Sequence, residues 1–199
     1  WLDRPLIPGL KIDRWTVIYV ALMAFVVFTR LWDLGSRSYC HDESIHAWEA
    51  WKLATGQGYI HDPVYHGPFL YHITALVFAV LGDTDVTGRL ATSLAGIAIV
   101  LAPLAMRRWL GRKGVLAATL LMAISPVLMH RSRYIRHDQF AILFNLTLII
   151  ASLRYLVEPR ARYLYVAAAA LALGFCGKET TFITYAIVGT FLAALCLYQ

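Results

Sequence analysis

The chain has 199 residues, of which 59% are hydrophobic and only 15% are charged. Soluble domains carry about 25% charged residues, so this composition excludes a soluble globular domain and indicates an integral membrane protein. A net charge of +6, without an aromatic-basic surface for stacking on bases, points to membrane orientation and anionic lipid. Nucleic acid is therefore excluded as a partner.

Six apolar segments are predicted to cross the membrane as helices, because each has close to the twenty residues that a bilayer core requires. In chain order they are 15–34, 88–107, 114–130, 139–157, 163–177 and 180–198. No small-residue cleavage site follows the first segment, so we expect it to stay as an anchor. The sequence begins at Trp1 and stops at Gln199 inside an apolar run. We therefore expect residues 1–199 to be the N-terminal part of a longer transmembrane domain.

A further apolar segment, 67–82, opens with Gly67-Pro68 and is short for a span. The placement of positive charge decides its topology. If it does not cross, one face holds 1–14, 107–113 and 154–162, where Lys and Arg are roughly three times denser than on the other face. This contrast fades if the segment crosses. We therefore predict an interfacial or re-entrant helix at 67–82, a cytoplasmic N-terminus, and a cell inner or plasma membrane location.

The first outer loop then extends over about residues 35–87. Residues 42–55 are predicted to form a helix that Gly56-Gln57-Gly58 ends, and Asp62-Pro63 and Gly67-Pro68 mark turns. The sequence thus predicts an all-α polytopic bundle of about six transmembrane helices, with two surface helices in the first outer loop.

Three charged clusters interrupt the apolar sequence, and this topology places all of them on the outer side. They are His41-Asp42-Glu43, the run from Arg133 to Asp138, and Gly177-Lys178-Glu179. Charge is costly beside lipid, so such clusters are functional candidates. Each also has a structural alternative: helix capping for the first, an Arg–Asp pair at a helix start for the second, and a tight turn at the membrane edge for the third.

The residue types suit a reaction in which a hydroxyl attacks and a phosphate leaves. Asp42, at the start of a surface helix, is a candidate general base. Arg133 and Arg136 offer fork-like hydrogen bonds to phosphate, and Lys178 offers a point charge. Asp138 is expected to orient these groups, to hold a metal or to act as a second acid.

A divalent metal is a weaker prediction. His61, Asp62 and His66 carry metal-binding side chains, but their spacing matches no HExxH or related motif. No other cofactor is predicted. The three cysteines lack a C-x-x-C pair, which disfavours a disulfide framework or a thiolate zinc site. A single bridge between Cys40 and Cys176 remains a minor alternative, because both are expected near the outer surface.

Several motifs occur in an order and spacing that resembles the N-terminal half of GT-C-class membrane glycosyltransferases. Within that class it resembles protein O-mannosyltransferase-like and aminoarabinose-transferase-like enzymes, and most of all the branch of flippase-activity-associated proteins. The motifs are Tyr39-Cys40-His41-Asp42-Glu43, the segment from Tyr65 to Leu70, Thr87-Gly88-Arg89-Leu90, the segment from Arg107 to Arg112, Ser125-Pro126, and the segment from Ser132 to Asp138. The likeness covers nearly the whole chain, although each motif alone is weak.

The resemblance implies a polyprenyl-phosphate-sugar donor and a site that faces away from the cytoplasm. It implies that Asp42 and Glu43 of the first outer loop supply the catalytic carboxylate, and that Arg136 and Asp138 correspond to the family's basic-acidic motif in the second outer loop. Lys178 matches only loosely a later lysine that lies near the lipid phosphate in the family. His41 and Glu179 are further orienting candidates. One departure is His66-Gly67-Pro68, where relatives often carry His-Pro-Pro-Leu.

The sequence therefore predicts direct displacement at the anomeric carbon, with Asp42 as the base and with Arg136 and Lys178 beside the departing phosphate. Two alternatives stay open. One is a structural or assembly subunit of a larger membrane complex. The other is a translocation-associated protein that binds the lipid-sugar without cleaving it.

Overall fold

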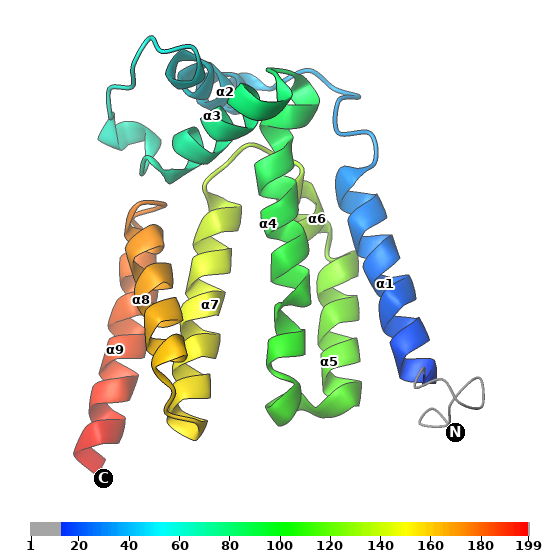
Figure 1. Cartoon of the computed structure of the whole chain (residues 1–199), viewed down its shortest axis with the longest axis vertical. Coiled ribbons are helices and arrows are strands. Elements are labelled where there is room, and N and C mark those ends of the chain that lie inside the picture. Colours follow the sequence, from blue (N-terminus) through cyan, green and yellow to red (C-terminus); the bar gives the residue numbers. More distant parts are fainter. Residues whose placement is uncertain (1–12, 199) are drawn as a thin grey trace.

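The computed structural model describes residues 13–198, which form a helical bundle capped at one end by two further helices (Figure 1). The elements are α1 (Arg14–Leu31), α2 (His41–Ala54), the 3-10 turn η1 (Pro63–Tyr65), α3 (Phe69–Leu81), α4 (Asp85–Ala105), α5 (Arg107–Ile124), α6 (Pro126–Ser132), α7 (Asp138–Val157), α8 (Ala161–Phe175) and α9 (Thr181–Tyr198). The predicted all-α polytopic membrane bundle is confirmed. Arg4 and Lys11, which contributed to the prediction of a cytoplasmic N-terminus, lie outside the described residues.

Four helices, α1, α4, α7 and α9, are long and apolar enough to cross a membrane. A fifth span is added if α5 and α6 count as one bent pair. Helix α8 has 15 residues and is shorter than these, but it stands alongside α7 in the bundle (Figure 1). The described residues therefore hold four or five candidate spans, and α8 is a shorter apolar helix that would complete the predicted six.

The predicted span 114–130 is not one straight helix, because the chain bends by 64° between α5 and α6. Pro126 has no N–H to continue the helix, so α5 ends at Ile124 and Ser125 caps α6 instead. The bend leaves carbonyls at the end of α5 without helical partners. The fully buried Arg30 of α1 donates to two of them, at 3.0 Å to Ala123 and 3.3 Å to Met122.

The two surface helices are α2 and α3, which lie across the upper end of the bundle (Figure 1). Their bounds agree closely with the predicted segments 42–55 and 67–82. They pack together in one apolar cluster in which Ala47 and Ala50 of α2 meet Leu70 and Phe78 of α3. Burial of these side chains holds α2 in place, and the charged start of α2 is thereby positioned over the bundle.

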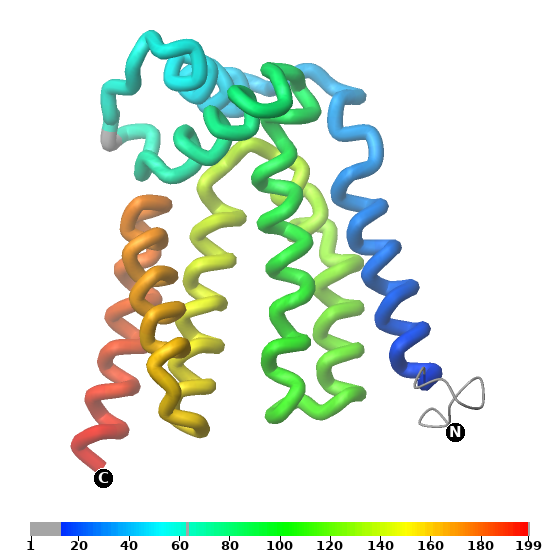
Figure 2. The backbone as a smooth tube through the Cα atoms, viewed as in Figure 1, coloured from blue at the N-terminus to red at the C-terminus, as the bar shows by residue number. Residues whose placement is uncertain are grey.

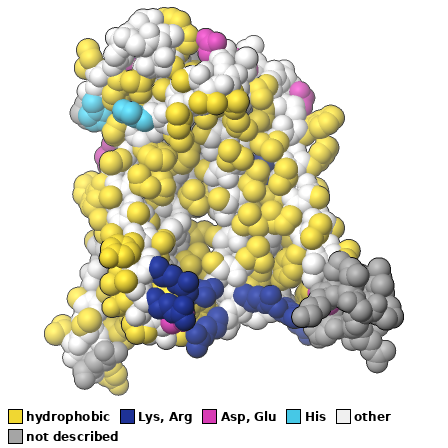
Figure 3. Space-filling model, in the orientation of Figure 1, with side chains coloured by type: hydrophobic (Ala, Val, Ile, Leu, Met, Phe, Trp, Pro, Cys, Tyr) yellow, Lys and Arg dark blue, Asp and Glu magenta, His cyan; other side chains and the backbone are white. Residues whose placement is uncertain are grey.

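Positive charge gathers at the opposite end, where α1 begins and α9 ends (Figures 1 and 3). The connections there carry the sequence's cationic runs, from Arg107 to Lys113 and from Arg154 to Arg162. Arg154 also donates to the carbonyl of Ala105 at the end of α4, at 3.1 Å from Nε. The separation of the cationic connections from α2 and α3 follows the pattern that predicted the topology.

The chain at residues 66–69 docks onto the turn between α8 and α9, which lies directly beneath it (Figure 2). The amide of Gly67 donates to the carbonyl of Gly177 at 3.1 Å, and the amide of Phe69 donates to Cys176 at 2.9 Å. A Cβ on Gly67 would lie 2.2 Å from the Cys176 oxygen. Proline lacks the donated N–H and carries a ring, so this contact disfavours a proline at position 67.

We expect Gly67→Ala to destabilise the protein by about 1–3 kcal/mol, because the added methyl group must displace a backbone carbonyl. Thermal unfolding of the detergent-solubilised protein would measure this as a lower midpoint. The matched control is Gly189→Ala in α9, where nothing lies within 4 Å of the position that the added methyl group would take. Equal midpoints for the two variants would show that residues 66–69 do not dock as described.

Candidate functional site

The three charged clusters meet at the end of the bundle that carries α2 and α3. They reach it from the first turn of α2, from the segment before α7 and from the turn between α8 and α9. Two ion pairs connect them and join residues far apart in the sequence, Arg136 with Asp42 and Lys178 with Asp138. The prediction that these clusters occupy one side of the bundle therefore agrees with the fold.

Asp42 and Arg136 form the most accessible of these pairs. The Arg136 Nη1 donates to Asp42 Oδ2 at 2.9 Å, and the Asp42 side chain is 44% exposed. Both residues line a small cavity of about 80 Å³, together with His46, Tyr65, His66 and their neighbours Ile45 and Val64. Asp42 is thus an open carboxylate with a fixed orientation, which is the arrangement a general base requires.

Asp138 and Lys178 form a second pair beside the first. The Lys178 ammonium donates to Asp138 Oδ1, and Arg131 Nη1 donates to Oδ2 at 3.1 Å. Asp138 is the first residue of α7, where a negative charge also interacts favourably with the helix dipole. The expected orienting role of Asp138 matches this geometry, and so does the structural alternative of an Arg–Asp pair at a helix start.

Two buried histidines lie between the ion pairs. His46 is 5% exposed and its Nδ1 lies 3.0 Å from the Tyr71 hydroxyl, and its ring meets the His137 ring edge-on at 5.1 Å. Burial lowers the pKa of His46 to about 4, and the positive charge of Arg136 contributes to the shift. Burial likewise lowers the pKa of His137 to about 3. Both rings are therefore neutral at pH 7, in contrast to the ion-paired side chains near them.

Glu43 has a different environment from Asp42, although the two are adjacent in the sequence. Its side chain is fully buried, and it accepts hydrogen bonds from Arg89 Nε at 2.8 Å and Nη2 at 2.9 Å. The amides of Cys40 and Ile135 donate to its oxygens as well. Burial would raise the pKa of Glu43, but the Arg89 hydrogen bonds and these amides outweigh it and lower the pKa. Neither carboxylate oxygen of Glu43 is therefore open to a substrate in this structure.

Arg133, which the sequence suggested for phosphate binding, holds the end of α1. Its guanidinium donates to the carbonyls of Thr29, Trp32 and Asp33 at 2.6–3.0 Å. A cation at a helix C-terminus satisfies carbonyls that lack helical partners and interacts favourably with the helix dipole. Arg136 is therefore the arginine of this run that faces Asp42.

The remaining predicted residues lie at the edge of the site. His66 Nδ1 lies 2.7 Å from Glu179 Oε2, which ties residue 66 to the α8–α9 turn. His41 begins α2 and is exposed. His61 contacts Tyr59, and Asp62 accepts from the Val64 amide.

Within residues 13–198 no three histidine, cysteine or acidic side chains converge as metal ligands, so His61, Asp62 and His66 do not form the predicted group. The cysteines Cys40, Cys176 and Cys196 are free, so the Cys40–Cys176 bridge is not formed.

Sequence reasoning missed Arg89, His46, His137 and Tyr71. Arg89 stands in the first turns of an apolar span, and a charge in that position requires a buried partner. That signal could have pointed to the pairing with a first-loop acid. The histidines gave no such signal, because only the fold shows that residues 46 and 137 face each other.

Comparison with known protein families gives a match over much of the bundle. The family model described as dolichyl-phosphate-mannose-protein mannosyltransferase matches residues 65–197, which is more than half of the chain. The matched region contains the second and third charged clusters but begins after α2, so Asp42 and Glu43 precede it. No match was found among curated proteins or among solved structures.

Proposed function

Because the chain belongs to the dolichyl-phosphate-mannose-protein mannosyltransferase family, we propose that it is a glycosyltransferase with a polyprenyl-phosphate-sugar donor. The family is one of membrane enzymes, and the chain is an integral membrane protein. In the proposed reaction the sugar passes to a hydroxyl acceptor at the end of the bundle that carries α2 and α3. That end faces away from the cytoplasm in this proposal, because the cationic connections gather at the other end.

The observation that carries the proposal is the pairing of the half-exposed Asp42 with Arg136 at an open cavity. The Asp138–Lys178 pair lies close by, since the charges of Asp42, Arg136 and Asp138 all act on the His46 ring. A base and two cations at one site suit a reaction in which a hydroxyl loses its proton while a phosphate gains charge. A site for purely structural ion pairs would not need an accessible carboxylate.

The proposed step is a single displacement. Asp42 accepts the proton of the acceptor hydroxyl while the oxygen of that hydroxyl forms a bond to the anomeric carbon of the donor sugar. The bond from that carbon to the lipid phosphate oxygen breaks, and the phosphate leaves with the electron pair. Arg136 and Lys178 stabilise the charge that it gains, and one displacement inverts the anomeric centre. Within the described residues Arg136 has one hydrogen bond, through Nη1, so its other N–H groups can bind the phosphate.

The test uses liposomes that contain the purified protein, with dolichyl-phosphate-linked tritiated mannose or glucose as the donor and with methyl α-mannoside, maltotriose or a threonine peptide as the hydroxyl acceptor. We expect saturable donor binding and release of dolichyl phosphate. In Arg136→Met we expect about a tenfold to hundredfold loss of donor binding, because a hydrogen bond to a charged group contributes about 1.5–3 kcal/mol. Arg160→Met, an exposed arginine at the opposite end, is the control and should bind normally.

The outcomes separate the three functional classes. Donor binding without release of dolichyl phosphate would replace the transferase with a protein that only binds or moves the lipid-sugar. No specific donor binding would favour a structural subunit. Equal effects of the Arg136 and Arg160 substitutions would remove Arg136 from the donor site.

A further inference from the structure

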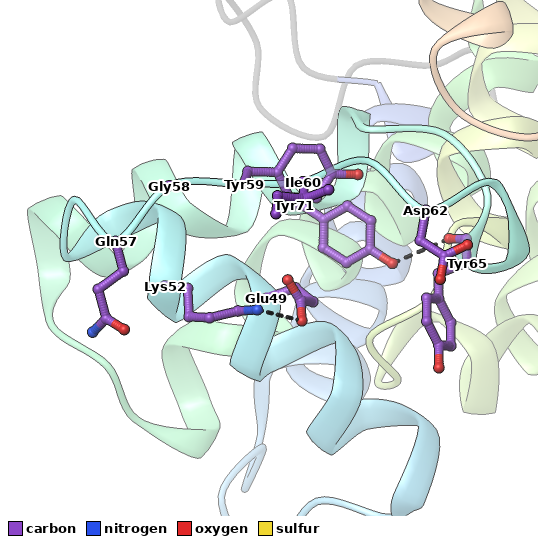
Figure 4. A pocket seen from close by; sticks show the side chains of 9 residues that line it. All are labelled: Glu49, Lys52, Gln57, Gly58, Tyr59, Ile60, Asp62, Tyr65 and Tyr71. Atoms are coloured by element: carbon purple, nitrogen blue, oxygen red, sulfur yellow. Dashed lines mark hydrogen bonds and ion pairs between the residues drawn. The ribbon is translucent and has the colours of Figure 1, made fainter.

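A larger cavity lies beside the Asp42 site, between α2 and the loop that follows it (Figure 4). Its volume is about 450 Å³, which falls within the range of small-molecule sites. The cavity near Asp42 has about 80 Å³ and admits only a small group. The larger cavity is lined by Glu49, Lys52, Gln57, Gly58, Tyr59, Ile60, Asp62, Tyr65 and Tyr71. We call it the tyrosine cavity.

The tyrosine cavity and the Asp42 site share a wall. Tyr65 lines both cavities. Tyr71 joins them through its hydroxyl, which donates to the Tyr65 carbonyl at 3.1 Å and lies 3.0 Å from His46 Nδ1. His46 in turn lines the Asp42 site. A molecule held in the tyrosine cavity is therefore separated from the Asp42 site by the shared wall residue Tyr65.

The lining of the tyrosine cavity combines aromatic faces with hydrogen-bonding groups. The rings of Tyr59 and Tyr71 lie 5.2 Å apart, and Figure 4 shows them together on one side of the cavity. Burial raises the pKa of both tyrosines, so their hydroxyls stay protonated. The Tyr71 hydroxyl already donates to the Tyr65 carbonyl, whereas the Tyr59 hydroxyl, 3.1 Å from His61 Nδ1, can donate to a ligand when that nitrogen carries the proton. Gln57 adds an amide on the opposite side. Such a surface suits a ligand that has both C–H faces and many hydroxyl groups.

Charge in the tyrosine cavity narrows the class of ligand further. Glu49 and Lys52 neutralise each other in an ion pair of 2.7 Å, which leaves the carboxylate of Asp62 as the excess charge. Asp62 lies on the same lining and also accepts from the Val64 amide. A slightly negative lining disfavours phosphorylated or acidic ligands. Carboxylates are also good acceptors for the hydroxyl groups of neutral ligands.

We propose that the tyrosine cavity binds a neutral carbohydrate as the acceptor of the transfer reaction. The inference rests on the proposed function, which requires a hydroxyl at Asp42. In the bound state a sugar ring packs against Tyr59 and hydrogen-bonds to Glu49 and Gln57. One of its hydroxyls passes Tyr65, gives its proton to Asp42 and forms the new bond to the anomeric carbon of the donor sugar.

The test measures binding alone, so it does not depend on turnover. The protein is placed in lipid nanodiscs free of sugar detergents, and binding of maltotriose and of methyl α-mannoside is followed by saturation-transfer NMR. A capped, uncharged pentapeptide with one threonine is the competing probe. We expect saturable binding of at least one sugar, no displacement by the peptide, and at least a fivefold weaker affinity in Tyr59→Ala.

Two further variants make the result specific. Glu49→Gln keeps the size of the side chain but removes its charge, and we expect it to weaken sugar binding as well. Trp48→Ala removes an exposed ring from the same helix, but that ring lines a different cavity. It should bind sugar like the unsubstituted protein. Thermal unfolding of each variant shows whether the fold is retained.

The inference is overturned if neither sugar binds saturably, if the peptide binds in preference, or if Trp48→Ala weakens binding as much as Tyr59→Ala. Release of dolichyl phosphate that persists while sugars fail to bind would overturn only the acceptor assignment. Sugar binding that persists without any donor binding would instead overturn the proposed transferase and leave a carbohydrate-binding cavity.

Discussion

Asp42→Asn is expected to lower the rate of sugar transfer by about a hundredfold to ten-thousandfold, which is the usual contribution of a positioned acid or base. Asparagine has nearly the same shape and can still accept a hydrogen bond from Arg136, so the cavity and the fold should remain. What it cannot do is take a proton from the acceptor. The measurement is the rate of dolichyl phosphate release at saturating donor and with a hydroxyl acceptor present, with donor affinity determined in parallel.

The matched control for this substitution is Asp83→Asn. Asp83 is an exposed carboxylate on the same end of the bundle, in the turn between α3 and α4, and it lies outside the Asp42 site. A general loss of negative charge at the surface would affect both variants alike. Full activity in Asp42→Asn would reject Asp42 as the base, whereas a large loss of donor affinity would show that Asp42 contributes to donor binding.

The topology could be predicted because it depends on properties that are local in the sequence. Apolar length and the density of Lys and Arg in the connections were enough to predict that segment 67–82 is not one of the spans, and α3 lies across the end of the bundle. The same reasoning did not predict the break within 114–130, since hydropathy is insensitive to a bend. Ser125-Pro126 carried the missing signal, because proline favours a helix start and removes the N–H that would continue the preceding helix.

The roles of neighbouring charged residues could not be predicted, because they depend on contacts across long sequence separations. Asp42 and Glu43 are adjacent, yet the former meets Arg136 at 94 residues' separation in an open site and the latter meets Arg89 at 46 residues' separation in the interior. Adjacent residues of a helix point about 100° apart. One of two neighbouring acids can therefore face a cavity while the other faces the core.

Glu43→Ala is expected to destabilise the protein by about 3–5 kcal/mol, because it leaves the guanidinium of Arg89 buried without its counter-charge. Arg89 is 1% exposed and also donates to the carbonyls of Leu34, Arg37 and Ser38. The substitution should therefore loosen the connection from α1 to α2 as well. Reversible unfolding in mixed micelles would measure the loss, and hydrogen exchange of residues 34–43 would locate it.

The control is Glu158→Gln, whose ion pairs with Arg160 and Arg162 are largely exposed and should contribute less than about 1 kcal/mol.

A comparison of Glu43→Gln with Asp42→Asn separates the roles of the two acids of the first cluster. If Glu43 acts only by positioning, Glu43→Gln should lose stability, and its remaining folded fraction should retain more activity than Asp42→Asn. A stable but inactive Glu43→Gln would instead mean that Glu43 takes part in the chemistry. In that case the carboxylate would have to leave Arg89 during the reaction.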